Sequence, residues 1–261
     1  MSKQFILARE KKALIKQFLK NGERIDGRKN FEYREIEVIK NVIQNAEGSA
    51  IAKIGATQAL AAIKLDIIAP FPNEEDRGGL IINAEFSPLA TGKLEFSQFD
   101  ENNIELSRVV DRAIRSSECI DMEKLFIEEG KVFGVFLDVY IIDNNGNAFD
   151  AALLASSLAI KNCRFPKVEN GKIIREEIIG NLPLKNPLPL SCTFSKIDDY
   201  LLLDATYDEE IASDAQLIIA TSGNYVCSIQ KRGEGSIKKE EVLKLIDISF
   251  EQSKTLRKYL E

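Results

Sequence analysis

Three arginines in one segment are spaced so that they could bind anions together. Apolar residues recur every three or four positions through residues 100–115, which predicts an amphipathic helix that starts near Asp100. Arg108, Arg112 and Arg115 fall in a line across from the apolar side. Taken alone, this segment allows two interpretations. The row is either a solvated face that pairs with acidic residues of the same helix, or a set of guanidinium groups that hold phosphates or a partner's carboxylates.

The chain contains no histidine. Its absence removes the usual general base, the usual zinc ligand and every Ser–His or Cys–His catalytic arrangement. Catalysis would therefore need carboxylates, lysine, arginine or a bound metal. The formal net charge is −6, which is unlike a broadly basic, stand-alone nucleic-acid-binding protein. Nucleic-acid binding would need a local patch, or a patch that other subunits complete.

Composition indicates an ordinary globular protein with one large domain or two small ones. Of the 261 residues, 44% are hydrophobic and 29% are charged. No apolar run is long enough to cross a bilayer, and the first residues lack the apolar core of a signal peptide. The four cysteines form no CxxC pair, so we expect reduced thiols and no zinc site. We therefore predict a cytoplasmic protein without a bound metal or other cofactor.

The order of expected elements favours an α+β fold with helices packed on mixed sheets. Pro166 is expected to stop the third helix, and a connector at 182–190 divides the chain. Turns are expected at Asn144-Asn145-Gly146 and Asn170-Gly171. Helices are expected at 7–21, 100–115, 149–163 and 237–260, and strands at 33–39, 49–54, 58–68, 80–86, 125–128, 132–142, 192–197, 200–205, 215–221 and 225–230.

Several short motifs resemble the ribonuclease PH family. They are Asp26-Gly27-Arg28, residues 47–50 (EGSA), residues 54–58 (IGATQ), residues 100–112 (DENNIELSRVVDR) and the turn with its Ala-rich helix at 144–159. The similarity runs from about Gly22 to the final helix and is strongest to the non-catalytic ring subunits of the archaeal exosome. It implies a ribonuclease PH fold (ribosomal protein S5 domain 2-like). We thus expect an N-terminal helix at 1–22 and duplicated βαβ-type halves at 23–182 and 183–261.

The resemblance also implies partners. Such subunits alternate with a catalytic ribonuclease PH-type subunit in a hetero-hexameric ring, a trimer of heterodimers that carries RNA-binding cap subunits. The ring surrounds a channel for single-stranded RNA. Active members of the family degrade RNA from its 3′ end with phosphate as the attacking group, which requires a positive cradle and carboxylates.

Two anion-binding elements of the active family members are altered in this chain. Where they carry an Arg-Arg pair, this chain has Asn102 and Asn103. Where they carry a Gly-(Ser/Thr)-Arg loop that holds phosphate, it reads Gly146-Asn147-Ala148-Phe149-Asp150. The arginine is missing, and Asp150 is expected to repel an anion.

The third altered element is a pair of aspartates six positions apart. Here they become Asp204 and Glu210, with Asp208, Glu209 and Asp214 nearby. Five carboxylates could hold Mg²⁺. Without any group to hold phosphate, we expect them to form a solvated acidic loop instead, with no catalytic residue and no metal.

The remaining match favours RNA binding. Arg108 and Arg112 match positions that face the RNA path in the family's non-catalytic subunit, whereas Arg115 matches none. We predict that Arg108 and Arg112 bind RNA and that the chain supports the active site of its catalytic partner. The alternative is an autonomous phosphorolytic 3′–5′ exoribonuclease that uses Asp204, Glu210 and Asp214.

Overall fold

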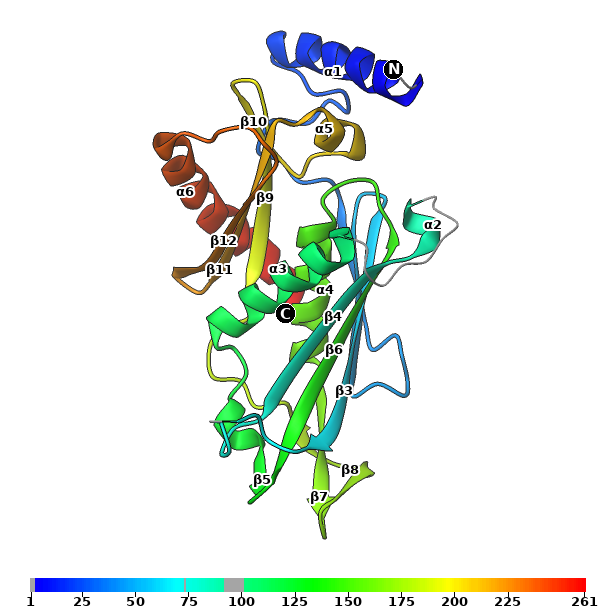
Figure 1. Ribbon diagram of the computed structural model, residues 1–261, viewed down its shortest axis with the longest axis vertical. Coiled ribbons are helices and arrows are strands. Elements are labelled where there is room, and N and C mark those ends of the chain that lie inside the picture. The colour runs from blue at the N-terminus through cyan, green and yellow to red at the C-terminus, as the bar shows by residue number, and fades with distance from the viewer. Residues whose placement is uncertain (1–2, 73, 92–100) are drawn as a thin grey trace.

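The computed structural model describes residues 3–72, 74–91 and 101–261. Two sheets follow one another along the long axis, and helices α3 (Glu101–Ser117) and α4 (Ala148–Lys161) lie where the sheets meet (Figure 1). Helix α4 packs on β2 and β3 of the first sheet and on β9 of the second. Helix α3 packs on β4 of the first and on β12 of the second. The two helices therefore share one core with both sheets.

The first sheet has six strands in the order β1-β2-β3-β6-β4, with β5 paired to β6. Strands β4 and β6 are parallel, with α3 in the connection between them, and the other pairs are antiparallel. Residues of β3 alternate between buried and more exposed positions, because successive side chains of a strand point to opposite faces. The strands are β1 (Ile36–Lys40), β2 (Gly48–Ile54), β3 (Thr57–Ile68), β4 (Gly79–Phe86), β5 (Phe126–Glu128) and β6 (Lys131–Asp143).

The second sheet has four strands in the order β10-β9-β11-β12, and all of its pairs are antiparallel. The parallel arrangement of β4, α3 and β6 belongs to the first half. Two-residue loops join β9 to β10 and β11 to β12, and such loops can only join antiparallel strands. The strands are β9 (Leu190–Ile197), β10 (Tyr200–Leu203), β11 (Ala215–Ser222) and β12 (Tyr225–Arg232); a separate hairpin is formed by β7 (Arg164–Glu169) and β8 (Lys172–Asn181).

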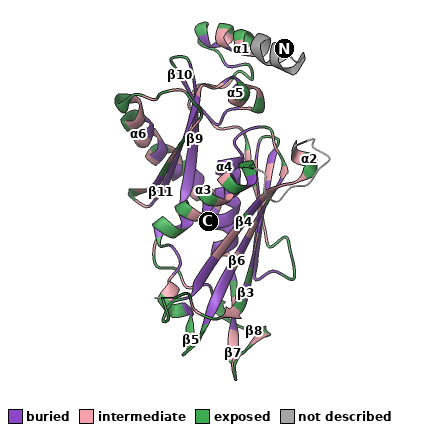
Figure 2. Cartoon of the chain, viewed as in Figure 1, coloured by how far each residue is buried: buried purple, intermediate pink, exposed green. Residues whose placement is uncertain are grey.

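Helix α4 is buried along nearly its whole length (Figure 2). Its small residues allow it to lie close to the first sheet. At Gly48 of β2, an added Cβ would lie 2.3 Å from the carbonyl oxygen of Ala159, so only glycine fits there. The other helices are α1 (Lys3–Lys20), α2 (Pro88–Thr91), α5 (Tyr207–Ala212), α6 (Lys239–Leu256) and the short 3₁₀ turns η1 (Met122–Leu125) and η2 (Arg257–Leu260).

Three local predictions need correction or comment. Pro166 does not end the third helix: α4 ends at Lys161, and Pro166 lies in β7, where the register shifts on both sides of it. The final helix begins at Lys239 and changes to a 3₁₀ turn after Leu256. Asp100, the expected start of α3, lies outside the described residues. No helix in the described part of the chain is long and apolar enough to span a membrane.

Candidate functional site

Helix α3 has the two faces that its sequence predicts. Arg108, Arg112 and Arg115 are all exposed. The opposite face is buried because it packs against β4. Its buried apolar residues are Leu106, Val109, Val110, Ala113 and Ile114.

The three arginines differ in their partners. Within the described residues, Arg108 makes no hydrogen bond or ion pair. Arg112 Nη1 donates to the neutral side chain of Gln230 on β12. Arg115 is neutralised by Asp111, whose Oδ1 lies 2.7 Å from its Nη2, and this hydrogen bond raises the pKa of Arg115. Arg108 and Arg112 therefore keep uncompensated charge, and Arg115 does not.

A second set of contacts ties α3 and α4 to the end of β12. Arg232 forms an ion pair with Glu105 of α3, with 3.1 Å between Nη2 and Oε2. The same guanidinium lies 5.2 Å from the ring centroid of Phe149, at the start of α4. One side of α3 carries Glu105, Arg108 and Arg112. This side is attached to β12 at Glu105, through Arg232, and at Arg112, through Gln230.

The first position of the altered Arg-Arg pair is exposed and the second is structural. Asn102 is exposed, whereas Asn103 is buried. The Oδ1 atom of Asn103 accepts a hydrogen bond from the backbone N–H of Phe86 at 2.9 Å. This contact joins the first turn of α3 to the end of β4, so the side chain at this position supports the fold.

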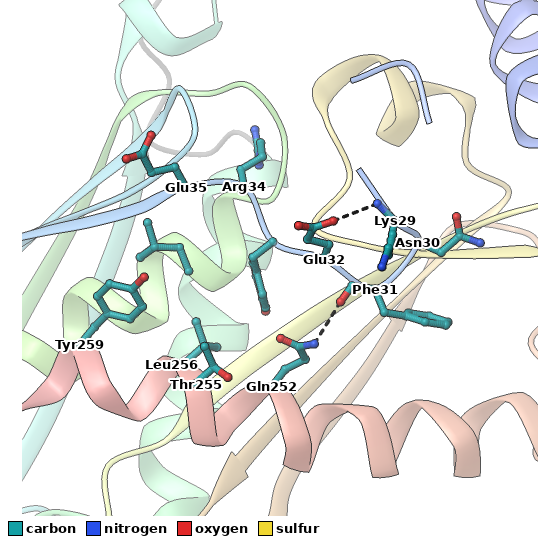
Figure 3. A pocket seen from close by; sticks show the side chains of 12 residues that line it. Lys29, Asn30, Phe31, Glu32, Arg34, Glu35, Gln252, Thr255, Leu256 and Tyr259 are labelled. Atoms are coloured by element: carbon teal, nitrogen blue, oxygen red, sulfur yellow. Dashed lines mark hydrogen bonds between the residues drawn. The ribbon is translucent and has the colours of Figure 1, made fainter. Parts of the chain in front are cut away.

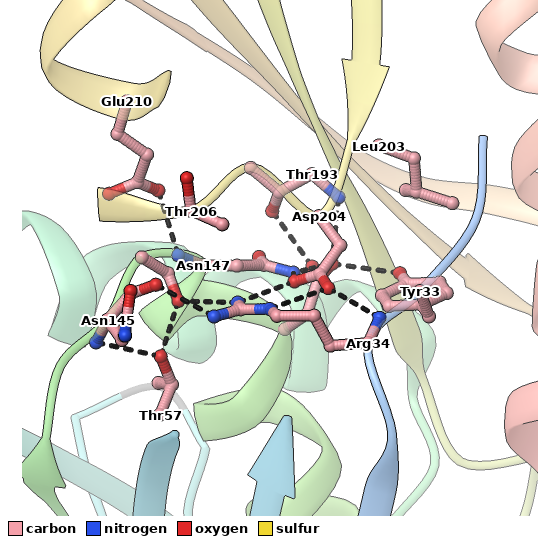
Figure 4. Close-up of polar contacts among 12 residues, drawn as sticks. Tyr33, Arg34, Thr57, Asn145, Asn147, Thr193, Leu203, Asp204, Thr206 and Glu210 are labelled. Carbon is pink, nitrogen blue, oxygen red and sulfur yellow. Dashed lines mark hydrogen bonds and ion pairs between the residues drawn. The ribbon is translucent and has the colours of Figure 1, made fainter. Parts of the chain in front are cut away.

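The loop before α4 packs against another backbone segment (Figure 4). Gly146 has a φ of +85°, and a Cβ added there would lie 2.4 Å from the carbonyl oxygen of Ala205. Asn147 follows in the left-handed conformation with a φ of 58°, and Tyr207 donates its backbone N–H to the carbonyl of Asn145. Residues 205–207 thus fill the space beside this loop.

A carboxylate of the chain itself lies at the start of α4. Oε1 of Glu210 accepts the backbone N–H of Asn147 at 2.9 Å and the side-chain amide of Gln216 at 3.1 Å. Burial raises the pKa of Glu210, and the bond from Asn147 opposes that rise. The N-terminal end of a helix attracts negative charge, and here Glu210 supplies it.

Asp150, which the sequence suggested would repel an anion, lies inside the fold and binds donors of the chain itself. It is 2% exposed and accepts five hydrogen bonds from both halves of the chain. Burial raises the pKa of Asp150, although hydrogen bonds from Ser191 and Asn147 limit the rise. Its donors are Tyr33, Asn147, Ser191 and Thr193. Asp150 therefore joins α4 to β9.

Asp204 is fully buried and is neutralised by Arg34 (Figure 4) and by Arg28. Its Oδ1 lies 2.8 Å from Nη2 of Arg34 and 2.7 Å from Nδ2 of Asn147. Its Oδ2 accepts from the backbone N–H and Nε of Arg34 and from Nη1 of Arg28. Burial alone would raise the pKa of Asp204, but the hydrogen bonds and charge of Arg34 lower it. Both oxygens are thus bound within the chain.

Glu209 and Asp214 have different partners, so the expectation of one solvated acidic loop is wrong. Glu209 is 1% exposed and pairs with the equally buried Arg24, which donates from Nε and Nη2. Asp214 pairs with Lys12 of α1 at 2.7 Å. Among the described residues, no group of three or more acidic, cysteine or histidine side chains could hold a metal ion.

Reasoning from the sequence missed the three arginines that bind these carboxylates. Arg24, Arg28 and Arg34 lie in one segment that crosses to the second half, and their acidic partners are about 170 to 185 residues away. The Asp26-Gly27-Arg28 turn was the available signal. Its Arg28 pairs locally with Asp26 and over a long range with Asp204.

A groove of about 770 Å³ is lined by part of the same segment (Figure 3). Its walls are residues 29–36 and the C-terminal part of α6 with η2. Gln252 of α6 donates to the carbonyl of Phe31 at 3.0 Å and holds the two walls together. Charges of both signs line the groove, including Lys29, Glu32 and Glu35. This mixture provides no concentrated charge for an ionic ligand.

Comparison with known families gives two matches. The 3′ exoribonuclease family (RNase PH), domain 1, matches residues 32–166, and domain 2 of the same family matches residues 188–252. Together they cover most of the chain, and both sheets fall within the matched ranges.

Similar proteins match over nearly the full length. The exosome complex component Rrp42 of Thermococcus gammatolerans is 41% identical over 266 residues, which cover 100% of this chain and 97% of the relative. The protein of the same name from Methanothermobacter thermautotrophicus is 42% identical over 252 residues, with 95% and 93% covered. A chain in the structure of the Archaeoglobus fulgidus exosome with RNA bound to the active site has a TM-score of 0.91 and 38% identity, with 98% and 100% covered. The ribonuclease PH fold is therefore confirmed.

Proposed function

Because the chain belongs to the 3′ exoribonuclease (RNase PH) family, we propose that it is a non-catalytic ring subunit of an exosome and contacts RNA through Arg108 and Arg112. Relatives about 40% identical to it are named exosome complex components. A chain of 38% identity comes from an exosome that holds RNA. Active members of the family need a phosphate cradle and free carboxylates, and the altered residues of this chain serve the fold instead.

One observation carries the non-catalytic part of the proposal. The start of α4 already holds a carboxylate, because Asn147 donates its backbone N–H to Glu210. An attacking phosphate would have to displace this carboxylate and would meet the backbone of residues 205–207 beside Gly146. Asp204 also lacks a free oxygen for a metal, since Arg28, Arg34 and Asn147 bind both of them.

The RNA-contacting part depends on the uncompensated charge of α3. Arg108 and Arg112 are exposed and lack a carboxylate partner among the described residues. Guanidinium groups in this state suit the phosphates of a nucleic-acid backbone. The net charge of −6 means that such binding is local to this face.

We also propose the surroundings of this subunit. It would alternate with a catalytic ribonuclease PH-type subunit in a hetero-hexameric ring in the cytoplasm, beneath RNA-binding cap subunits. Its domains would be an N-terminal helix at 1–22 and two halves at 23–182 and 183–261. The alternative of an autonomous phosphorolytic enzyme is not favoured, because Asp204, Glu210 and Asp214 are each bound by other groups of the chain.

The test is to incubate the purified chain with oligoadenylate, inorganic phosphate and Mg²⁺. We expect no release of nucleoside diphosphates from the chain alone, and release once a catalytic ring subunit is added. Mass measurement of the mixture should show three copies of each subunit. Release of nucleoside diphosphates by the chain alone, at a rate that follows its own concentration, would overturn the proposal.

A further inference from the structure

The guanidiniums of Arg112, Arg115 and Arg232, on and beside α3, fall into two groups by the charge of their partner. Arg115 pairs with Asp111, and Arg232 pairs with Glu105, so both are neutralised. Arg112 instead donates to the amide oxygen of Gln230. A neutral acceptor fixes the direction of a guanidinium without cancelling its charge. Arg112 has five N–H donors, so the contact with Gln230 leaves others for a ligand.

The position of Gln230 suits this role. It lies on β12, on the same side of the strand as Arg232, two residues later, which pairs with Glu105 of α3. Near the other end of α3, Tyr225 of β12 donates its hydroxyl to the carbonyl of Ser117 at 2.8 Å. The strand is therefore attached to α3 independently of Gln230, and Gln230 is not needed to hold the two elements together.

We propose that Gln230 is a positioning residue that holds Arg112 in the orientation in which it binds an RNA phosphate; this rests on the proposed function. Arginine has a long side chain, and ordering it upon binding weakens affinity. A guanidinium already held by Gln230 has less freedom to lose. Arg108 has no such partner among the described residues, so the two arginines differ in how far they are ordered before RNA binds.

The experiment measures binding of single-stranded oligoadenylate to the assembled ring of this chain and its catalytic partner, over a range of salt concentrations. Gln230→Ala should weaken binding about three-fold. It should leave the slope of log affinity against log salt unchanged, because no charge is removed. Gln230→Glu should weaken binding further and flatten the slope by about 0.7 for each engaged subunit, because a carboxylate would neutralise Arg112.

Two controls separate positioning from a merely structural role. Tyr225→Phe removes a different hydrogen bond between β12 and α3 with no change of charge, and it should leave binding unchanged. Gln230→Ala should have no further effect when Arg112 is already replaced by alanine. If Gln230→Ala acts equally with and without Arg112, or if Tyr225→Phe weakens binding as much, the positioning role is wrong. If the Arg108→Ala, Arg112→Ala double variant binds as the parent does, the RNA-binding proposal itself fails, whatever Gln230 does.

Discussion

The backbone N–H of Asn147 donates a hydrogen bond to Oε1 of Glu210 at 2.9 Å. This contact places a carboxylate of α5 at the start of α4, where the helix dipole favours negative charge. Gln216 donates to the same oxygen at 3.1 Å and helps to fix it. The end of α4 that could bind an anion is thus filled by the chain itself.

Asp204 should be important for stability, because its buried carboxylate neutralises Arg28 and Arg34. Asp204→Asn keeps the shape of the side chain and tolerates the φ of 51° at this position. It leaves Arg28 and Arg34 without their shared carboxylate, which should lower the free energy of unfolding by about 3 kcal/mol at neutral pH. Urea unfolding of parent and variant measures the difference. Asp214→Asn, which breaks the partly exposed pair with Lys12, should cost less than about 1 kcal/mol.

The effect of Asp204→Asn should depend on pH. The native pKa of Asp204 is lowered below its ordinary value of 3.8, so its ionised form stabilises the fold above that pH. The stabilisation is lost as the pH falls below 3.8 and through the native pKa. Parent and variant should therefore become similar in stability in acid. A gap that stays constant down to the lowest pH at which the parent folds would show that the charge of Asp204 is not what matters.

Glu210 should show the opposite pH dependence. Its native pKa is raised above the ordinary value of 4.5 by burial, so the folded state binds the Glu210 proton more tightly than the unfolded chain does. The stability that this provides is complete below pH 4.5 and is lost as the pH rises through the native pKa. Glu210→Gln keeps an acceptor for Asn147 and should be at least as stable as the parent at neutral pH. Relative to the variant, the parent should gain stability as the pH falls, measured by urea unfolding at several pH values.

The two arginines of α3 should contribute to RNA affinity through charge. Each phosphate contact with a single strand contributes about 0.7 to the slope of log affinity against log salt. Replacing Arg108 and Arg112 with alanine in the assembled ring should weaken oligoadenylate binding and flatten the slope by up to about 1.4 for each engaged subunit. An unchanged slope would identify this row as a solvated face.

The matched control for that experiment is the neighbouring ion pair. Asp111→Asn combined with Arg115→Gln removes the pair without changing the net charge of α3. Because Arg115 is already neutralised, this variant should bind oligoadenylate with the affinity and slope of the parent. A flattened slope would mean that Arg115 also engages the RNA.

Local patterns predicted most of the fold. The apolar spacing of α3 places Leu106 and Val110 in the core, and Asn170-Gly171 forms the turn between β7 and β8, as expected. The prediction for Pro166 was wrong, because a proline that follows a helical pattern is also typical of a helix end. In the structure the helix has already ended at Lys161, with Asn162 as its C-cap, and Pro166 lies in a strand with register shifts. The second sheet is antiparallel because two-residue loops join its neighbouring strands. Which strands these loops join as neighbours is known only from the strand pairing in the structure.

The site was harder to predict because its chemistry depends on distant partners. A sequence shows that Asp204, Glu209 and Glu210 are acidic, and an acidic run is usually solvated. It does not show that Arg24 and Arg34 cross to the second half and bury those charges. The exposure of Arg108 and Arg112, by contrast, follows from helical spacing alone and appears in the structure.

The most direct measurement is a crystal structure of this chain grown or soaked in inorganic phosphate, with no partner subunit. We predict that Glu210 stays bonded to the backbone N–H of Asn147 and that no phosphate occupies the start of α4. A phosphate bound beside Asn147, with Glu210 displaced, would contradict the account, since the chain would then hold the attacking group of an active enzyme.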